Sequence, residues 1–287
     1  MPKLKRGLLN KNGKDFMKKG LAIKIFSLLL LSCLFFAVNV QAQKKTDKKS
    51  EKPLPTLFII GDSTVNNSGE GMLGWGNVIG DLFDKTKINV VNRARGGRSS
   101  RTFFTEGLWE QVLGEIKKGD FVLMQFGHND GGEIDKEKFR GSIRGTGEEI
   151  QDITGANGKP ETVHTFGWYM RKFIADAKAK GATAIVLSPV PRNVWKDGKV
   201  ERAAENYGKW ARETAESQKV LFIDLNEITA QKYEKAGAEK VGAEYFTTKD
   251  HTHTSAAGAR MNAASVVEGL KKLKKNPLKK FISKVKK

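Results

Sequence analysis

The sequence is poor in cysteine, histidine and proline, with one, four and seven copies among its 287 residues. The single Cys33 lies inside an N-terminal apolar run, so the rest of the chain can form no disulfide and offers no thiolate. Zinc sites need three or four convergent ligands, and four histidines without cysteine supply few of them. These shortages argue against a disulfide-stapled scaffold, a cysteine nucleophile and a cysteine-rich zinc module.

Only one long apolar run is present, and it lies near the N-terminus. It reads FSLLLLSCLFFAV (26–38), follows a lysine-rich stretch and precedes the small-residue end VQA. This order predicts a secretory signal peptide over residues 1–42, because the run is shorter than the roughly 20 residues of a membrane span. We expect cleavage after Ala42, with Met1 or Met17 as the start, and a secreted or periplasmic protein. The alternatives are an uncleaved anchor and a lipoprotein modified at Cys33.

Positive charge is abundant, but it is concentrated near the two ends of the chain. The net charge of +19 comprises +7 in residues 1–42, +3 in 43–52 and +9 in 271–287, which leaves residues 53–270 neutral. A domain that binds nucleic acid carries its basic patch on the folded body. We therefore expect no nucleic-acid partner.

The segments that flank the neutral body are both rich in lysine. Residues 43–55 end in Pro53 and Pro55 and are predicted to be a polar linker. Residues 274–287 form a basic tail, in which Pro277 is expected to end or kink the preceding helix. Two interpretations of the tail remain open: a solvated end, or a weak electrostatic contact with an anionic polymer or membrane.

The body alternates between short apolar runs and longer segments with helical spacing. The runs are apolar on both faces, as in strands of a sheet that is covered on both sides, and they occupy 56–60, 88–91, 121–126, 183–188 and 220–225. Helical spacing appears in 75–83, 109–118, 166–180, 204–218 and 256–273, the last with Thr254 or Ser255 as its N-cap. This alternation predicts an α/β fold over 56–273: a three-layer α/β/α sandwich around a five-stranded parallel sheet. Residues 131–164 fit no element and are expected to cross the active face.

Polar and glycine-rich blocks follow the predicted strands. GDSTV places Ser63 at the end of the first strand, NRARGGRSSRTF places Gly97 after the second, and FGHND places Asn129 after the third. The block DHTHTSAAGAR (250–260) precedes the last helix. Because ligands of an open parallel sheet bind beyond the carboxyl ends of its strands, these blocks are expected to meet in one site.

The residue types in these blocks are those of a serine hydrolase. Ser63 needs a base to remove its proton, His253 is the candidate base, and Asp250 would hold the other ring nitrogen of that histidine. The backbone N–H groups of Ser63 and Gly97 and the side-chain amide of Asn129 would stabilise the oxyanion that forms on attack. No G-x-S-x-G elbow surrounds Ser63, which disfavours the α/β-hydrolase fold.

A metal site is the competing interpretation of the block DHTH. His251 and His253 lie two residues apart and would point the same way on an extended backbone, so they could chelate an ion beside Asp250. This interpretation leaves Ser63 and Asn129 unexplained, and we therefore predict no metal and no cofactor.

The four blocks, taken in order, resemble the SGNH (GDSL-type) hydrolase family and, within it, the rhamnogalacturonan acetylesterase branch. The family's signature residues would fall on Ser63, Gly97, Asn129 and His253, with Asp250 three positions before the histidine. The resemblance implies a flavodoxin-like α/β/α sandwich and an esterase acting on esters, often acetyl groups on plant polysaccharides. We expect a monomer. The alternatives are a lipid-directed esterase or lysophospholipase on the same fold, and a non-catalytic polysaccharide-binding protein.

Further side chains near the predicted active face are candidate substrate contacts. His128, Arg98 and Trp168 are the leading ones, since aromatic faces suit sugar rings and guanidinium groups suit uronate carboxylates. The wider set of tryptophans and arginines also includes Trp75, Arg101, Arg171, Arg192 and Trp195. For Asp62 we expect a hydrogen bond that orders the serine loop, and for Asp130 an Asx-turn. His164 has no assigned partner.

Overall fold

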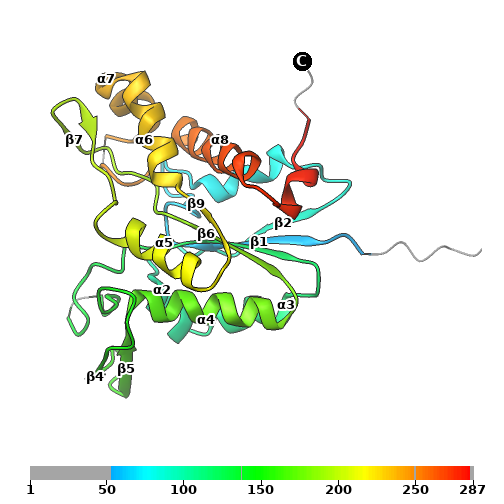
Figure 1. Ribbon diagram of the computed structural model, residues 1–287. Helices are drawn as coiled ribbons and strands as arrows, with labels where there is room; N and C mark the ends of the chain where they lie inside the picture. Colours follow the sequence, from blue (N-terminus) through cyan, green and yellow to red (C-terminus); the bar gives the residue numbers. More distant parts are fainter. Residues whose placement is uncertain (1–52, 137, 249, 285–287) are drawn as a thin grey trace, which may run out of the picture. The chain divides into compact units, whose positions relative to one another are not determined.

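The computed structural model describes residues 53–136, 138–248 and 250–284 (Figure 1). The predicted signal peptide, most of the predicted linker and the last three residues of the basic tail lie outside the described residues. In the part of the chain that is described, no helix is both long and apolar enough to cross a membrane.

A five-stranded parallel sheet forms the centre of the domain, in the order β2-β1-β3-β6-β9. All five predicted strands are confirmed: β1 Thr56–Gly61, β2 Asn89–Asn92, β3 Phe121–Gln125, β6 Thr183–Leu187 and β9 Leu221–Ile223. Alternate side chains of β1 enter two different cores, Leu57 and Ile59 on one face and Phe58 and Ile60 on the other. The apolar runs therefore have the composition that a sheet covered on both faces requires.

Helices cover both faces of this sheet, which makes the fold a three-layer α/β/α sandwich (Figure 1). One face packs against α2 Ser100–Thr105, α3 Leu108–Glu115, α4 Phe166–Ala179 and α5 Tyr207–Ser217. The other packs against α6 Leu225–Ala236, α8 Ala256–Lys272 and the 3₁₀ turns η1 Trp75–Asn77, η2 Ile79–Leu82 and η4 Pro277–Phe281. The short α7 Ala238–Lys240 and the π-helical turn η3 Val241–Tyr245 follow α6.

The helix predicted over 75–83 is wrong in type, because the segment forms the two 3₁₀ turns. The Asn77 side-chain oxygen accepts hydrogen bonds from the N–H groups of Asn67 and Gly74, which ties the turn to the loop before it. A Cβ at Gly76 would lie 2.6 Å from the Asn92 side chain, so the backbone approaches the end of β2 closely here. These tertiary contacts outweigh the helical spacing of the apolar residues.

The segment 131–164, for which no element was predicted, contains an antiparallel hairpin. Its strands are β4 Ile150–Thr154 and β5 Pro160–His164, and the hairpin projects from the lower left of the domain in Figure 1. The buried Arg101 fastens the segment, donating to the carbonyls of Ile134 and Gly141 and to the carboxylate of Glu161. A second, two-residue hairpin joins β7 Trp195–Lys196 to β8 Lys199–Val200.

The basic tail is not a solvated end over residues 277–283, so that interpretation is wrong for this part. Helix α8 begins after the N-cap Ser255 and ends at Lys272, as predicted, and η4 then folds back onto the sheet. Leu278 and Phe281 are buried in the core formed with α8. The N–H of Asp84 donates to the carbonyl of Phe281 at 2.8 Å. Electrostatic contact of the tail lysines with an anionic surface stays a prediction.

Because Phe281 is part of the core, its truncation should destabilise the fold. Phe281 is 8% exposed and meets the Phe121 ring edge-on, with 5.7 Å between ring centroids. Phe281→Ala should lower the free energy of unfolding by about 3 kcal/mol, measured by urea denaturation. The exposed Lys279 on the same turn provides the matched control, and Lys279→Ala should leave stability within about 0.5 kcal/mol of wild type. Equal midpoints for the two variants would show that the tail does not stabilise the domain.

Candidate active site

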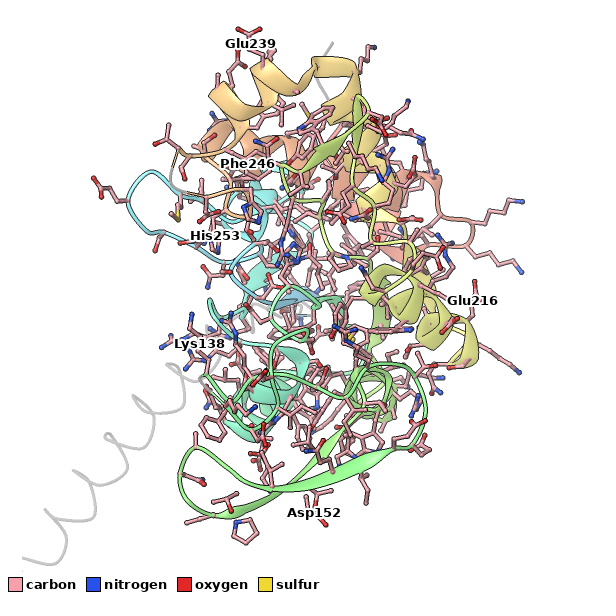
Figure 2. The ribbon with its side chains drawn as sticks, turned by 90° about the vertical axis from the view of Figure 1, so that its left-hand side faces the viewer. Lys138, Asp152, Glu216, Glu239, Phe246 and His253 are labelled. Atoms are coloured by element: carbon pink, nitrogen blue, oxygen red, sulfur yellow. The ribbon has the colours of Figure 1, made fainter. Side chains whose placement is uncertain are left out.

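The predicted site residues meet at the carboxyl edge of the sheet, where the strand order changes direction. β1 lies between β2 and β3, so the loops after these three strands bring Ser63, Gly97 and Asn129 to one place. The segment before α8 adds His253 to this edge. Figure 2 looks onto this side of the domain, with His253 between the labelled Phe246 and Lys138.

The loop that carries Ser63 is held by a chain of buried hydrogen bonds. The Trp75 indole N–H donates to Gln125 Oε1 at 2.8 Å, and Gln125 Nε2 donates to Thr64 Oγ1 at 2.6 Å. Thr64 Oγ1 and the backbone N–H of Thr64 both donate to Asp62 Oδ1, at 2.7 and 2.9 Å. The prediction that Asp62 orders this loop is confirmed. Trp75, in contrast, is fully buried, so its predicted place among the substrate contacts is wrong.

Glycine is required immediately before this loop. A Cβ at Gly61 would lie 2.4 Å from the Gln125 carbonyl oxygen and 2.6 Å from the Val65 side chain. Both separations are far below van der Waals contact. The sharp turn from β1 into the serine loop therefore depends on the missing side chain.

Ser63, His253 and Asp250 form a continuous hydrogen-bonded chain. His253 Nε2 lies 2.8 Å from Ser63 Oγ, and His253 Nδ1 lies 2.7 Å from Asp250 Oδ2. The other carboxylate oxygen of Asp250 accepts the backbone N–H groups of Thr252 and His253 at 2.6 and 2.7 Å. Burial raises the pKa of Asp250, but the hydrogen bonds from the His253 ring and the two N–H groups outweigh it, so the pKa lies below its ordinary value. An ionised Asp250 favours the tautomer with the proton on Nδ1, which leaves Nε2 free to accept the serine proton.

These contacts also bear on the competing interpretation of the DHTH block (250–253) as a metal site. Both ring nitrogens of His253 are engaged, one by Ser63 and the other by Asp250. His251 is exposed, and its backbone carbonyl accepts the N–H of Asn193 at 2.8 Å. His253 therefore has no free ring nitrogen with which to chelate a metal together with His251.

Three groups of hydrogen-bond donors surround Ser63. In the described part of the chain, the backbone N–H groups of Ser63 and Gly97 have no hydrogen-bond partner. Gly97 has φ +78°, a left-handed conformation that glycine adopts without strain. Asn129 Nδ2 donates to the Arg98 carbonyl at 2.8 Å, and its second amide hydrogen is not used by that bond. That these donors stabilise an oxyanion beside Ser63 stays a prediction.

Asp130 lies directly beneath this donor group and does not form the predicted Asx-turn. It is fully buried, and its Oδ1 accepts from the N–H and hydroxyl of Ser100 and from the Ser142 hydroxyl. Its Oδ2 is buried without a hydrogen-bond partner among the described residues. Burial raises the pKa of Asp130 from 3.8 to about 6, although the bonds from Ser100 and Ser142 oppose the shift. The carboxyl group thus connects α2 to the segment after β3.

The raised pKa predicts a pH dependence of stability. The folded protein binds this proton more tightly than the unfolded chain does, so the contribution is complete below about pH 4 and is lost as the pH rises to about 6. Asp130→Asn keeps the Oδ1 acceptor and removes the titration. Between pH 4 and pH 7 the stability of the variant relative to wild type should therefore rise by about 2 kcal/mol. Urea denaturation of both proteins at the two pH values measures this, and a constant difference would contradict the assignment.

The three leading substrate contacts have different surroundings. The His128 side chain is 5% exposed, and its Nδ1 faces Asp62 Oδ2 at 3.7 Å. Burial lowers the pKa of His128, so the ring is neutral. Arg98 is paired with Glu106 at 2.8 Å. Trp168 stacks on His164, with 3.7 Å between ring centroids and 9° between planes. The contact of these residues with substrate stays a prediction.

Two of the wider set of predicted contacts serve the fold. The buried Arg101 holds the 131–164 segment, as described above. Arg171 donates to the carbonyls of Thr146 and Gly147 and pairs with Glu148. Both guanidinium groups therefore bind carbonyls and carboxylates of the protein itself.

A pocket of about 380 Å³ beside His128 was not predicted from the sequence. It lies beyond the ends of β3 and β6 and in front of α5, and its polar lining includes His128, Arg192, Glu201, Arg202, Asn206 and Tyr207. No pattern along the chain marks it, because its residues come from four separated segments. The pocket adjoins the Ser63 loop through His128, whose Nδ1 faces Asp62.

Comparisons with known proteins agree with this geometry. The model of the GDSL-like lipase/acylhydrolase family matches residues 59–261. The chain is 33% identical to the rhamnogalacturonan acetylesterase of Emericella nidulans, over 75% of this chain and 84% of that protein. It is 31% identical to the probable rhamnogalacturonan acetylesterase YesY of Bacillus subtilis, over 76% and 93%.

Solved structures show the same fold. The YxiM protein of Bacillus subtilis superposes with a TM-score of 0.61 and 28% identity, covering 76% of this chain. The present chain spans 56% of the length of that protein. An acetyl xylan esterase from Geobacillus stearothermophilus superposes with a TM-score of 0.51 at 19% identity, covering 75% and 94% of the two chains, a likeness of fold alone.

Proposed function

This chain belongs to the GDSL-like lipase/acylhydrolase family and is an esterase, and we propose that it removes acetyl groups from acetylated rhamnogalacturonan. The proposal includes secretion or periplasmic export and a covalent acyl-serine route. The observation that carries it is the hydrogen-bonded chain Asp250–His253–Ser63 beside unpaired N–H donors. The similarity to two rhamnogalacturonan acetylesterases favours this polymer.

In the acylation step, Ser63 Oγ attacks the carbonyl carbon of the acetyl group and His253 Nε2 takes the hydroxyl proton. The carbonyl oxygen becomes an anion and is stabilised by the N–H groups of Ser63 and Gly97 and by the amide of Asn129. Asp250 stabilises the imidazolium through Nδ1–H. As the tetrahedral intermediate collapses, the ester C–O bond breaks and His253 returns the proton to the departing sugar oxygen.

Deacylation repeats these steps with water as the nucleophile. His253 takes a proton from a water molecule, whose oxygen attacks the acetyl carbon on Ser63. The same donors stabilise the second oxyanion. When the bond to Ser63 Oγ breaks, His253 returns the proton to the serine, and acetate leaves. No cofactor is required in either step.

Removal of the Asn129 amide tests the oxyanion assignment. Asn129→Ala should lower kcat on a small acetyl ester by roughly 10²–10³-fold with little change in KM, because the bond strengthens as charge develops. Steady-state kinetics with p-nitrophenyl acetate provides both constants. Since Asn129 also donates to the Arg98 carbonyl, a circular dichroism melt should accompany the assay to separate catalysis from folding. A variant that keeps more than half of the wild-type kcat would exclude this role.

The proposed polymer is tested by comparing substrates. We expect acetate release from acetylated rhamnogalacturonan to be faster than from acetylated xylan, and hydrolysis of acetyl esters to be faster than that of octanoyl esters. The polar lining of the pocket beside His128 favours a sugar over an acyl chain. Faster release from xylan would overturn the polymer assignment while leaving the catalytic chain intact. A preference for octanoyl esters would instead support a lipid-directed esterase.

A further inference from the structure

Four arginines near the site, Arg95, Arg140, Arg144 and Arg192, have no carboxylate partner among the described residues. Most other arginines there are ion-paired, as in Arg93–Glu115, Arg98–Glu106, Arg101–Glu161, Arg171–Glu148, Arg202–Glu227 and Arg212–Asp224. Arg140 and Arg192 instead contact backbone carbonyls, Arg140 Nη1 that of Gly97 at 3.5 Å and Arg192 Nη2 that of His128 at 3.2 Å. Both contacts lie at the protein surface, so the guanidinium groups face solvent.

The two carbonyls belong to the two loops that carry the oxyanion donors. Gly97 is itself one donor, and His128 precedes the donor Asn129. Because β1 lies between β2 and β3, these loops flank Ser63 on opposite sides. Arg140 and Arg192 therefore contact the two loops that adjoin the Ser63 loop.

The surroundings of Arg192 favour a ligand over a purely structural role. Arg192 lines the 380 Å³ pocket beside His128, together with Glu201 and Arg202. The charge of Arg202 is already compensated by Glu227 and Glu234, at 2.9 and 2.5 Å. Arg192 and Glu201 are the charged groups of this pocket without an ion-pair partner among the described residues, so Arg192 offers donors for a carboxylate and Glu201 offers acceptors for hydroxyl groups.

A guanidinium group has five N–H donors in a planar fork that matches a carboxylate. Each of these two arginines donates one hydrogen bond to a backbone carbonyl, which positions its guanidinium group beside the site. The remaining N–H groups are available to a ligand. We propose that Arg140 and Arg192 are specificity-determining residues that bind uronate carboxylates on either side of the acetylated sugar. This inference rests on the proposed polysaccharide substrate and adds which groups recognise the charge of the polymer.

The test compares native acetylated pectin with the same polymer after chemical reduction of its uronate carboxyls. Wild-type enzyme should favour the native polymer in kcat/KM. Arg140→Gln and Arg192→Gln should each reduce that preference roughly fivefold, and the double variant should lose it. Arg192→Lys, which keeps the charge without the fork, should retain part of it. Lys85→Gln removes one charge at the opposite edge of the sheet, where Lys85 pairs with Asp81, and should retain the full preference.

A binding measurement keeps the test independent of turnover. Unacetylated oligogalacturonate should bind the wild type at low salt and bind the double variant at least tenfold more weakly, with added salt weakening the wild-type complex. Equal binding by the two proteins, or a native-pectin preference that survives in the double variant, would overturn the inference. Failure of the proposed function has a different signature: wild-type enzyme would hydrolyse p-nitrophenyl acetate and release no acetate from either polymer.

Discussion

Replacement of Ser63 by alanine should lower kcat on p-nitrophenyl acetate by about 10⁶-fold, because the nucleophile that forms the acyl-enzyme is removed. His253→Ala should cost a similar factor, since the serine hydroxyl is a weak nucleophile without the base at 2.8 Å. The two effects should not add in the double variant, because serine and base act as one unit.

The loss of activity in Ser63→Ala reports on catalysis only if the variant folds like the wild type. Ser63 lies in a loop whose order comes from Asp62, Thr64 and Gln125, and its hydroxyl takes no part in that network. Thermal unfolding of Ser63→Ala should therefore match that of wild type. Residual turnover within tenfold of wild type, in a preparation free of wild-type enzyme, would contradict the covalent mechanism.

Asp250→Asn should lower kcat by about 10⁴-fold while leaving KM nearly unchanged. The carboxylate accepts Nδ1–H of His253 at 2.7 Å and so holds Nε2 in the form that accepts a proton. An asparagine amide can present N–H to this nitrogen instead, which stabilises the wrong tautomer and removes the charge that stabilises the imidazolium.

His251→Asn is the matched control for this variant, because His251 lies one residue from Asp250 and is exposed. It should retain wild-type kinetics. If Asp250→Asn kept more than a tenth of the wild-type kcat, another group would have to orient His253, and the assignment of Asp250 would be wrong.

The sequence predicted the strands and the place of the site residues, because each depends on a local pattern with one structural explanation. The five parallel strands were predicted because buried strands need apolar residues on both faces, and β1 and β3 supply them without interruption. The site was predicted because strand ends of a parallel sheet converge, which places Ser63 and Asn129 together whatever the intervening loops do.

The remaining features depend on contacts that only the folded chain creates. Helix α6 has exposed and buried positions but few large apolar residues, and it packs largely through Tyr233 and Leu225. Phe281 follows a lysine-rich stretch, so its burial against Phe121 has no local signal. The local sequence around Asp130 predicts a turn, because its hydrogen-bond partners Ser100 and Ser142 are distant along the chain.

The proposed acyl-enzyme can be observed directly with the polymer as acetyl donor. Asp250→Asn should slow both acylation and deacylation, so an acid quench of this variant during turnover of acetylated rhamnogalacturonan should preserve the fraction of enzyme that carries the acetyl group. Peptide mass spectrometry should then find one acetyl group on the peptide that contains Ser63, and none on that peptide in Ser63→Ala treated in the same way. An unmodified Ser63 in a preparation that is releasing acetate from the polymer would contradict the account.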